Sequence, residues 1–330
     1  MKHWDLAAIR DKTVYNAGFI VVKPKAVNRR IYTMMQDISR KSRNSLHDQI
    51  ALNIAIRTLR RRKILTSVTY LNSRLYMDGS LYFERMRPLL PSSDDRCSSV
   101  DKTKCPVLVV HNNWIVSKQA KTYRFREHFM WSYDGKDGYY SSQSRNYLMY
   151  TNPAPTPNVS QDIRILQMSS LGTALALGYL LERTVILPRF YRSANGKPCP
   201  LNSYIRMSTF DSCFRGKYRE SNFLQHPKVP QAVKQNMSHQ PLISHATRLS
   251  SSSKQFTVDS SSVVRLFRDR KERLLDVGIL AGVTIKFSDN STRNTFNQKV
   301  YKAFRTTNYR QQSRGGNLWP QIVGYVIDNT

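Results

Sequence analysis

The sequence predicts an α/β protein with two units, and three features support this prediction. The apolar run at 106–110 is followed at once by polar and basic side chains, as at the end of a buried strand. The apolar helical pattern over 162–182 leads directly into a second apolar run at 184–187, and a helix that feeds a strand is typical of α/β domains. A chain of 330 residues is long enough to form two such units.

The first part of the chain shows both kinds of hydrophobic period. An alternating pattern that passes into an apolar run predicts a strand, and Pro24 ends it because proline cannot donate to a sheet. Apolar side chains at helical spacing then predict two helices, and further short apolar runs predict strands. The expected strands lie at 14–23, 68–71, 81–83 and 106–110, and the expected helices lie at 26–39 and 47–60.

The second part follows a change in composition. From 132 to 160 the chain is rich in Gly, Ser, Asn, Tyr and Pro and ends in TNPAPTPNVS, which predicts a linker. Residues 1–131 and 161–330 are therefore expected to form separate domains. Within the second domain, the pattern predicts a helix over 262–275 and a strand at 283–287.

Two segments bear on membranes and targeting. The apolar run at 165–181 is short for a bilayer span and is interrupted by polar residues such as Gln167 and Ser169, so we expect a core helix. The opening residues MKHWDLAAIRD lack the apolar stretch of a signal peptide.

The formal net charge of +30 makes nucleic acid, an anionic membrane surface or an anionic small ligand possible partners. The run Tyr123-Arg124-Phe125-Arg126 interleaves aromatic and basic side chains, a pattern that can bind single strands by stacking and phosphate contact. Against this hypothesis, the sequence contains no recognisable nucleic-acid module, and its basic residues do not form one stripe.

The four cysteines do not predict a metal site. They form no CxxC pair, and no His and Cys spacing resembles a zinc finger. Pairing of Cys97 with Cys105 and of Cys199 with Cys213 would suit a secretory compartment, whereas buried free thiols are the alternative. The spacing leaves both open.

The end of the 106–110 strand is the first candidate site. His111 lies at that end and Lys118 follows one short turn later, and the strand ends of α/β sheets are where ligands bind. Imidazole is a common ligand of divalent metals, and a lysine ammonium suits a phosphate. Together they have the chemistry that a sugar-nucleotide site needs.

Three segments carry a resemblance to a known family. In order they are YNAGFIVVKP, SLHDQIALN and PVLVVHNNWIVSKQAKTYRFREHFMW, and together they resemble the nucleotide-diphospho-sugar transferase domain of glycosyltransferase family 77. The resemblance implies that residues 1–131 form the C-terminal half of a Rossmann-like GT-A domain. A looser similarity, over LGTALALGYLLERTVILPRF and CPLNSYIRM, is to the region after the catalytic domain in arabinosyltransferase-like members.

The resemblance also implies site residues and a cofactor. His111 matches a histidine that helps to hold Mn²⁺, and Lys118 matches a position that contacts the diphosphate of the donor. The remaining residues are Asn16, Ala17 and Gly18, which would line the donor sugar, and Asp48 and Gln49, which would hydrogen-bond sugar hydroxyls at the catalytic centre. Gly18 would let a ligand approach the backbone closely.

The implied function is a retaining, metal-dependent transfer of a sugar from a nucleotide-diphosphate donor to a protein or glycan acceptor. The family's DxD motif lies upstream of the NAGF strand, but the 15 residues before Asn16 contain only Asp5 and Asp11. We therefore expect an N-terminally truncated chain with impaired activity. A full-length form would carry a signal-anchor and lie in the Golgi or secretory pathway. Alternatives are a basic nucleic-acid-binding protein, although no nucleic-acid partner is expected, and a non-catalytic lectin-like secretory fragment.

Overall fold

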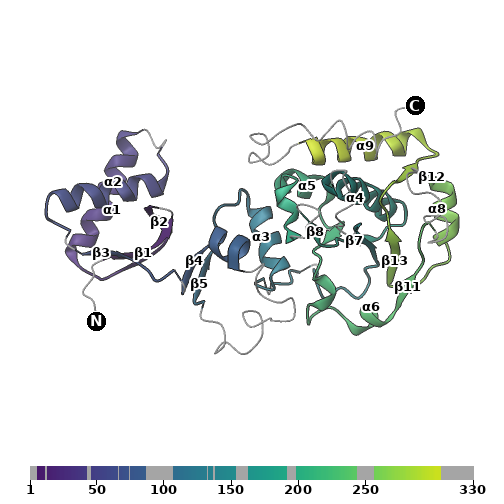
Figure 1. Ribbon diagram of the computed structural model, residues 1–330, viewed down its shortest axis with the longest axis horizontal. Coiled ribbons are helices and arrows are strands. Elements are labelled where there is room, and N and C mark those ends of the chain that lie inside the picture. The colour runs from purple at the N-terminus through teal and green to yellow at the C-terminus, as the bar shows by residue number, and fades with distance from the viewer. Residues whose placement is uncertain are drawn as a thin grey trace. The chain divides into compact units, whose positions relative to one another are not determined.

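The computed structural model describes residues 6–11, 13–42, 46–65, 67–73, 75–86, 107–131, 133–136, 138–153, 163–191, 198–243 and 256–305. The chain divides into two compact units, Met1–Val116 and Ser117–Thr330, and each is described by itself (Figure 1). Both combine helices with paired strands, and the second contains a five-stranded sheet of parallel strands. The predicted α/β class is confirmed.

The boundary between the units differs from the expected one. It follows Val116, so helix α3 (Lys118–Glu127) belongs to the second unit. Strand β6 (Tyr147–Thr151) lies inside the expected linker 132–160, yet it is the middle strand of the five-stranded sheet. The turn-forming residues on both sides of this short, aromatic-rich strand make its surroundings resemble a linker in sequence.

The first unit pairs a small sheet with two helices. The sheet has the order β2-β1-β3, in which β1 runs antiparallel to β2 and parallel to β3, and β4 and β5 form a separate parallel pair. The elements are β1 (Leu6–Asp11), β2 (Val14–Val22), α1 (Ala26–Lys41), α2 (Asp48–Arg61), β3 (Val68–Tyr70), β4 (Tyr76–Asp78), the π-helix η1 (Ser80–Met86) and β5 (Val109–His111).

The core of the first unit explains why its helices form. Buried α2 residues Leu52, Ile56 and Leu59 recur at helical spacing and pack with Leu6 of β1 and Ile31 of α1. Full burial of one such side chain stabilises the fold by roughly 1.5–3 kcal/mol. The predicted strands at 14–23 and 68–71 and both predicted helices are confirmed.

The predicted strand at 81–83 is wrong, because those residues lie in η1. Asp78 accepts hydrogen bonds from the backbone N–H groups of Ser80 (2.8 Å) and Leu81 (3.0 Å), which starts a helical turn there. The strand is β4, just upstream. The strand predicted at 106–110 is observed as β5, which is shorter and ends at His111 itself.

The five strands of the second unit have the order β10-β7-β6-β13-β11, and every neighbouring pair is parallel. The chain runs outward from β6 on one side, then crosses to the other side. Its elements after α3 and β6 are α4 (Ile163–Leu180), β7 (Thr184–Ile186), β8 (Phe190–Tyr191), β9 (Pro198–Cys199), η4 (Leu201–Ser203), α5 (Met207–Phe214), β10 (Tyr218–Arg219), η5 (Phe223–Gln225), α6 (Gln231–Gln235), β11 (Met237–His239), β12 (Phe256–Asp259), α8 (Ser260–Phe267), β13 (Leu274–Ile279), β14 (Val283–Lys286) and α9 (Asn290–Arg305).

Helix α4 packs directly on this sheet. A β-carbon at Gly178 would collide with the Val185 side chain of β7, so glycine permits the close approach of helix and strand. Gln167 of α4 is fully buried and donates to the carbonyl of Tyr191 at 2.8 Å, which satisfies its amide in the core. The expectation of a core helix is confirmed, and within the described residues no helix combines the length and apolar character that a membrane span requires.

The strands predicted at 184–187 and 283–287 are confirmed as β7 and β14, whereas the helix predicted over 262–275 is wrong in its second half. Helix α8 ends at Phe267, and Leu274 already begins β13, where buried leucines pair with β6.

Of the two alternatives that the spacing left open for Cys199 and Cys213, the structure has free thiols rather than a disulfide. Cys199 is buried and lies 3.2 Å from the hydroxyl of Tyr204. The other possible pair, Cys97 and Cys105, lies outside the described residues.

Candidate functional site

Strand β2 carries the three residues that were expected to line a donor sugar, but they lie on different faces. Asn16 is buried, and its Oδ1 atom accepts a hydrogen bond from the backbone N–H of Gly18 at 2.7 Å. Ala17, between them, packs against the hydrophobic core of the first unit. Because side chains alternate along a strand, Asn16 and Gly18 share one face and Ala17 points to the other. Ala17 is therefore removed from the candidate site.

His111, the last residue of β5, packs against Gly18. A β-carbon added at Gly18 would overlap the imidazole ring, so only glycine leaves room for it. We expected that Gly18 would admit a ligand to the backbone, but the imidazole fills the space where a side chain would start. The glycine at position 18 is thus explained by its contact with His111, which joins the YNAGFIVVKP segment to the segment that begins PVLVVHNN.

Asp78 is a site residue that the sequence reading missed. It is the register partner of His111 on the neighbouring parallel strand, so the two side chains project on the same face. Asn113 accepts a hydrogen bond from the backbone N–H of Gly79 at 2.6 Å, which fixes the chain just after Asp78. Because the strand was predicted at 81–83 and not at 76–78, the pairing of Asp78 with His111 could not be foreseen.

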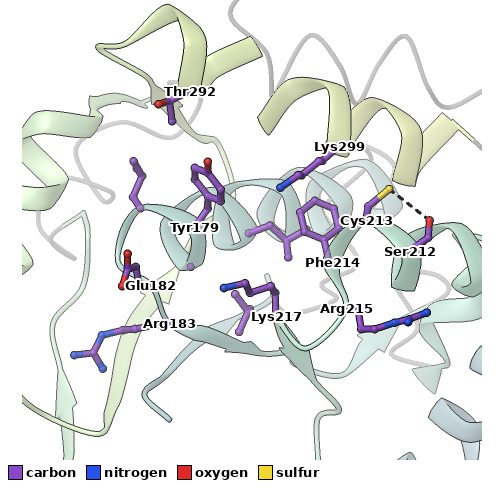
Figure 2. A pocket seen from close by; sticks show the side chains of 14 residues that line it. Tyr179, Glu182, Arg183, Ser212, Cys213, Phe214, Arg215, Lys217, Thr292 and Lys299 are labelled. Atoms are coloured by element: carbon purple, nitrogen blue, oxygen red, sulfur yellow. Dashed lines mark hydrogen bonds between the residues drawn. The ribbon is translucent and has the colours of Figure 1, made fainter. Parts of the chain in front are cut away.

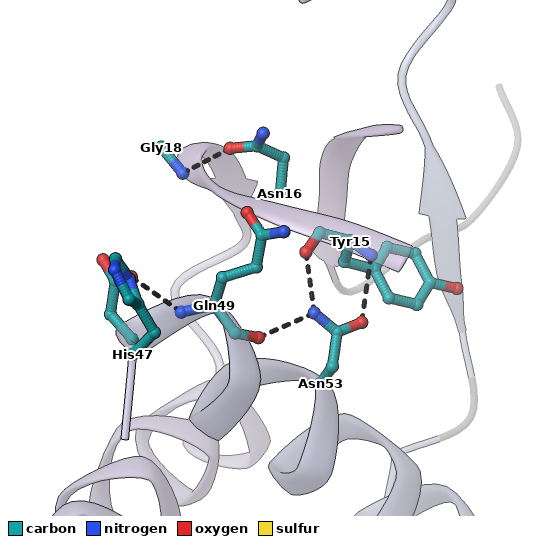
Figure 3. A network of polar contacts seen from close by, with 7 residues as sticks. Tyr15, Asn16, Gly18, His47, Gln49 and Asn53 are labelled. Carbon is teal, nitrogen blue, oxygen red and sulfur yellow. Dashed lines mark hydrogen bonds and ion pairs between the residues drawn. The ribbon is translucent and has the colours of Figure 1, made fainter. Parts of the chain in front are cut away.

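Asn53 is a second residue that was missed, and it joins α2 to β2 (Figure 3). Its side chain accepts from the backbone N–H of Tyr15 at 3.0 Å and donates to the carbonyl of the same residue at 2.7 Å. It also donates to the carbonyl of Gln49 at 2.8 Å. Asn53 is the last residue of the SLHDQIALN segment. A polar asparagine on the core side of a predicted helix was the feature of the sequence that could have pointed to it.

The two residues expected at the catalytic centre begin α2. Asp48 is largely exposed, and its carboxylate accepts the backbone N–H of Gln49 at 2.7 Å and lies 3.4 Å from Nδ1 of His47. A carboxylate at a helix N-terminus is stabilised by the helix dipole, which accounts for Asp48 locally. Gln49 differs, because its amide extends toward the β2 strand that carries Asn16 (Figure 3). The structure thus gathers Asn16, Gly18 and Gln49 with His111 around β2.

Lys118 belongs to the second unit, where it is exposed at the first position of α3. The residues gathered around β2 belong to the first unit. Ser117, just before it, caps α3 by accepting the backbone N–H of Ala120 at 3.2 Å.

The residues around His111 do not fit a metal held by the protein. Within the described part of the chain, no three His, Cys, Asp or Glu side chains gather as ligands. A manganese ion normally needs several carboxylate, imidazole or phosphate ligands. His111 with Asp78 alone falls short of that set, so no chemical step is assigned to a metal here.

The second unit contains a buried polar cluster where β10 ends. The ring of Tyr139 lies between two guanidinium groups, 3.5 Å from Arg126 and 4.0 Å from Arg219, and its hydroxyl donates to Glu220 at 2.6 Å. Burial, with a contribution from the nearby Glu220, raises the pKa of Glu127 to about 8. A pKa in this range favours the protonated form of Glu127 at neutral pH.

A histidine at the carboxyl end of β11 also meets an aspartate in the middle of β13. His239 of β11 and Asp276 of β13 are register partners, and Nδ1 lies 2.9 Å from Oδ2. The other carboxylate oxygen of Asp276 accepts the backbone N–H of Gly278 at 3.0 Å. The sequence analysis missed this pair because β11 was not predicted.

The aromatic and basic run that favoured nucleic-acid binding is mostly internal. Tyr123 and Arg124 are each 2% exposed, and the Arg126 guanidinium stacks on Tyr139. These side chains anchor α3 in the second unit, so this run does not offer the exposed rings that a single strand would stack on.

Comparison with known proteins gives no family: no protein-family model matches the chain, and neither curated proteins nor solved structures give a match.

Proposed function

We propose that the first unit recognises the sugar portion of a nucleotide-diphosphate sugar, as part of a glycosyltransferase that acts on a protein or glycan acceptor. One observation carries the proposal. The three segments that resemble glycosyltransferase family 77 are far apart in sequence, yet all of them meet at β2. Asn53 fixes α2 to Tyr15, and His111 of β5 packs on Gly18.

The side chains at this meeting point have suitable chemistry for a sugar. The amide of Gln49 carries donors and an acceptor, which is what hydroxyl groups require, and Asn16 holds the backbone of β2 in place by accepting the N–H of Gly18. The imidazole of His111 and the carboxylate of Asp78, on the paired strands β5 and β4, add further groups that can hydrogen-bond a hydroxyl. In this proposal these groups bind and orient the donor sugar.

The proposal assigns sugar recognition to this chain and leaves the departure of the nucleotide to groups outside it. The 330 residues contain no DxD motif, whose carboxylates would bridge a metal to the diphosphate. Transfer by this chain alone is therefore expected to be weak. We place the activity in the Golgi or secretory pathway, as the family resemblance implies.

The test is a binding titration of the purified chain with a panel of nucleotide sugars, each with and without Mn²⁺. Gln49→Ala and His111→Ala should each weaken binding about tenfold or more, the cost of one or two lost polar contacts. The matched control is Gln36→Ala, because Gln36 is an exposed glutamine of the neighbouring helix α1. Equal binding by the Gln49 and Gln36 variants would overturn the site.

The same preparation separates the two alternatives. Affinity for single-stranded RNA that falls steeply with salt, together with no nucleotide-sugar binding, would favour a nucleic-acid-binding protein. Glycan binding that ignores both Mn²⁺ and the nucleotide would favour the lectin-like hypothesis.

A further inference from the structure

The second unit contains a pocket at the amino ends of two strands of its sheet. It has a volume of about 850 Å³ and lies between the end of α4, the end of α5 and the middle of α9 (Figure 2). Arg183 and Lys217 directly precede β7 and β10, so the pocket lies at the amino ends of these strands. Its volume is within the range of small-molecule sites.

The charge of the pocket is strongly positive. Arg215, Lys217 and Lys299 line it with Arg183, whereas Glu182 is the one acidic side chain among the described residues of the lining. Among the described residues, neither Lys217 nor Lys299 has an acidic partner. Two exposed ammonium groups that line one pocket without an acidic partner create a positive potential that favours an anion.

A purely structural role explains only some of these cations. The Arg183 guanidinium donates to the backbone carbonyls of Tyr147, Arg270 and Glu272, so it serves the fold. Cations that follow a helix C-terminus are stabilised by the helix dipole, which covers Arg215 and Lys217 after α5.

Lys299 has no such explanation, because it lies well inside α9 rather than at the end of the helix. Its ammonium faces the pocket from the side opposite Lys217 (Figure 2). The two lysines therefore approach the same space from different elements.

One wall of the pocket is apolar. Tyr179 is 39% exposed, and Nζ of Lys299 lies 5.6 Å from the centre of its ring. The buried side chains of Leu175 and Phe214 continue this wall. An inorganic ion would leave these surfaces unused, whereas an anion with an aromatic or apolar body would cover them.

We propose that this pocket binds an organic phosphate or sulfate, with the anionic group between Lys217 and Lys299 and the apolar body against Tyr179. Charge-assisted hydrogen bonds from the two ammonium groups supply the affinity, and the tyrosine face supplies selectivity over the bare ion. The proposal concerns the second unit only and does not depend on sugar binding by the first unit.

The experiment uses the full chain and four probes: phenyl phosphate, phenyl sulfate, inorganic phosphate and inorganic sulfate. The phenyl esters should bind at least about tenfold more tightly than the inorganic ions, and the better ester identifies the anionic group. The double variant K217A/K299A should weaken ester binding at least about tenfold. The control K286A/K302A removes the same charge from exposed lysines outside the lining and should bind as the wild type does.

Cys213 supplies an independent measurement, because its thiol lines the pocket and is partly exposed. Saturating phenyl ester should slow alkylation of Cys213 at least about threefold, measured by mass spectrometry of the peptide that contains it. Two results would overturn the proposal. One is equal loss of binding in both double variants, which would mean attraction by overall charge. The other is ester binding with no protection of Cys213, which would place the ligand elsewhere.

Discussion

The imidazole of His111 occupies the space beside the α-carbon of Gly18, so two residues that are distant in sequence form one contact at β2. The backbone of Gly18 is not in the left-handed region that favours glycine. Its identity is therefore set by the side chain that it faces, and not by its own conformation.

Gly18→Ala should destabilise the protein because the new methyl group overlaps the imidazole ring. Overpacking of this kind costs typically about 1–3 kcal/mol. In chemical denaturation, we expect the unfolding midpoint to fall without a change in slope. Adding His111→Ala should recover most of the loss, since the smaller side chain makes room, and a double-mutant cycle would measure the coupling.

Gly216→Ala is the matched control for that cycle. Gly216 has a φ of +73°, and no atom lies within contact range of an added β-carbon, so its cost is backbone strain. We expect a loss of about 1 kcal/mol that His111→Ala does not recover. Recovery in both backgrounds would contradict the contact between His111 and Gly18.

Asn53→Ala should remove the link between α2 and β2. It leaves the N–H and carbonyl of Tyr15 without the side-chain partner that now satisfies both. We expect a loss of about 2–4 kcal/mol in the free energy of unfolding, from two hydrogen bonds and partly buried polar groups.

Asn53→Asp tests which part of the link matters. It keeps the acceptor for Tyr15 N–H but replaces the donor by a second acceptor that faces the Tyr15 carbonyl, so it should be at least as harmful as alanine. A loss below about 0.5 kcal/mol for both variants, the usual range for surface substitutions, would show that the link is incidental.

In the first unit, the sequence predicted the positions of helices and strands better than the contacts that their side chains make. Alternating and helical periods placed β2, α1 and α2, because apolar side chains recur along these elements at the spacing of a strand or a helix. Asn53, Asp78 and the contact at Gly18 could not be predicted in this way. Each depends on tertiary pairing between elements, and periodicity carries no information about which elements pair.

The second unit shows a different limit. Helix α4 is buried along most of its length and was recognised, whereas β6, β10 and β11 are short strands whose partners are distant in sequence. Two-residue β10 has no periodicity to detect, yet it carries Arg219 into the cluster with Tyr139. The His239 and Asp276 pair was hidden for the same reason.

The free energy of unfolding should fall as pH rises because of Glu127. Its pKa is raised to about 8 in the folded protein, chiefly by burial, from an ordinary value near 4.5. Between these values the folded state holds a proton that the unfolded state releases, so stability is full below about pH 4.5 and is lost as pH approaches 8. One pKa unit corresponds to about 1.4 kcal/mol, so the change amounts to a few kcal/mol.

Glu127→Gln should remove this slope and be more stable than the wild type above pH 8. The contrast is Glu272→Gln, because a hydrogen bond from its own backbone N–H, with another from Arg270, lowers the pKa of Glu272. The stabilisation from Glu272 is present above its ordinary pKa and is lost as pH falls, which is the opposite sign. Thermal unfolding from pH 3 to 9 would check both, and parallel curves for Glu127→Gln and wild type would contradict the buried proton.

Arg183→Lys should destabilise the second unit although it keeps the charge. The guanidinium donates to Tyr147 O at 3.2 Å, Glu272 O at 2.7 Å and Arg270 O at 3.0 Å, which ties the start of β6 to the segment before β13. A lysine ammonium cannot span three carbonyls in this planar arrangement. We expect a loss of about 2–4 kcal/mol by urea denaturation, because buried carbonyls are left unsatisfied.

Arg215→Lys is the matched control, since Arg215 is exposed and pairs with Asp211 at 3.3 Å. Exposed ion pairs contribute about 0–1 kcal/mol, so this variant should unfold almost as the wild type does. If both lysine variants unfold alike, the three carbonyls must be satisfied by water, and Arg183 would not hold the edge of the sheet together.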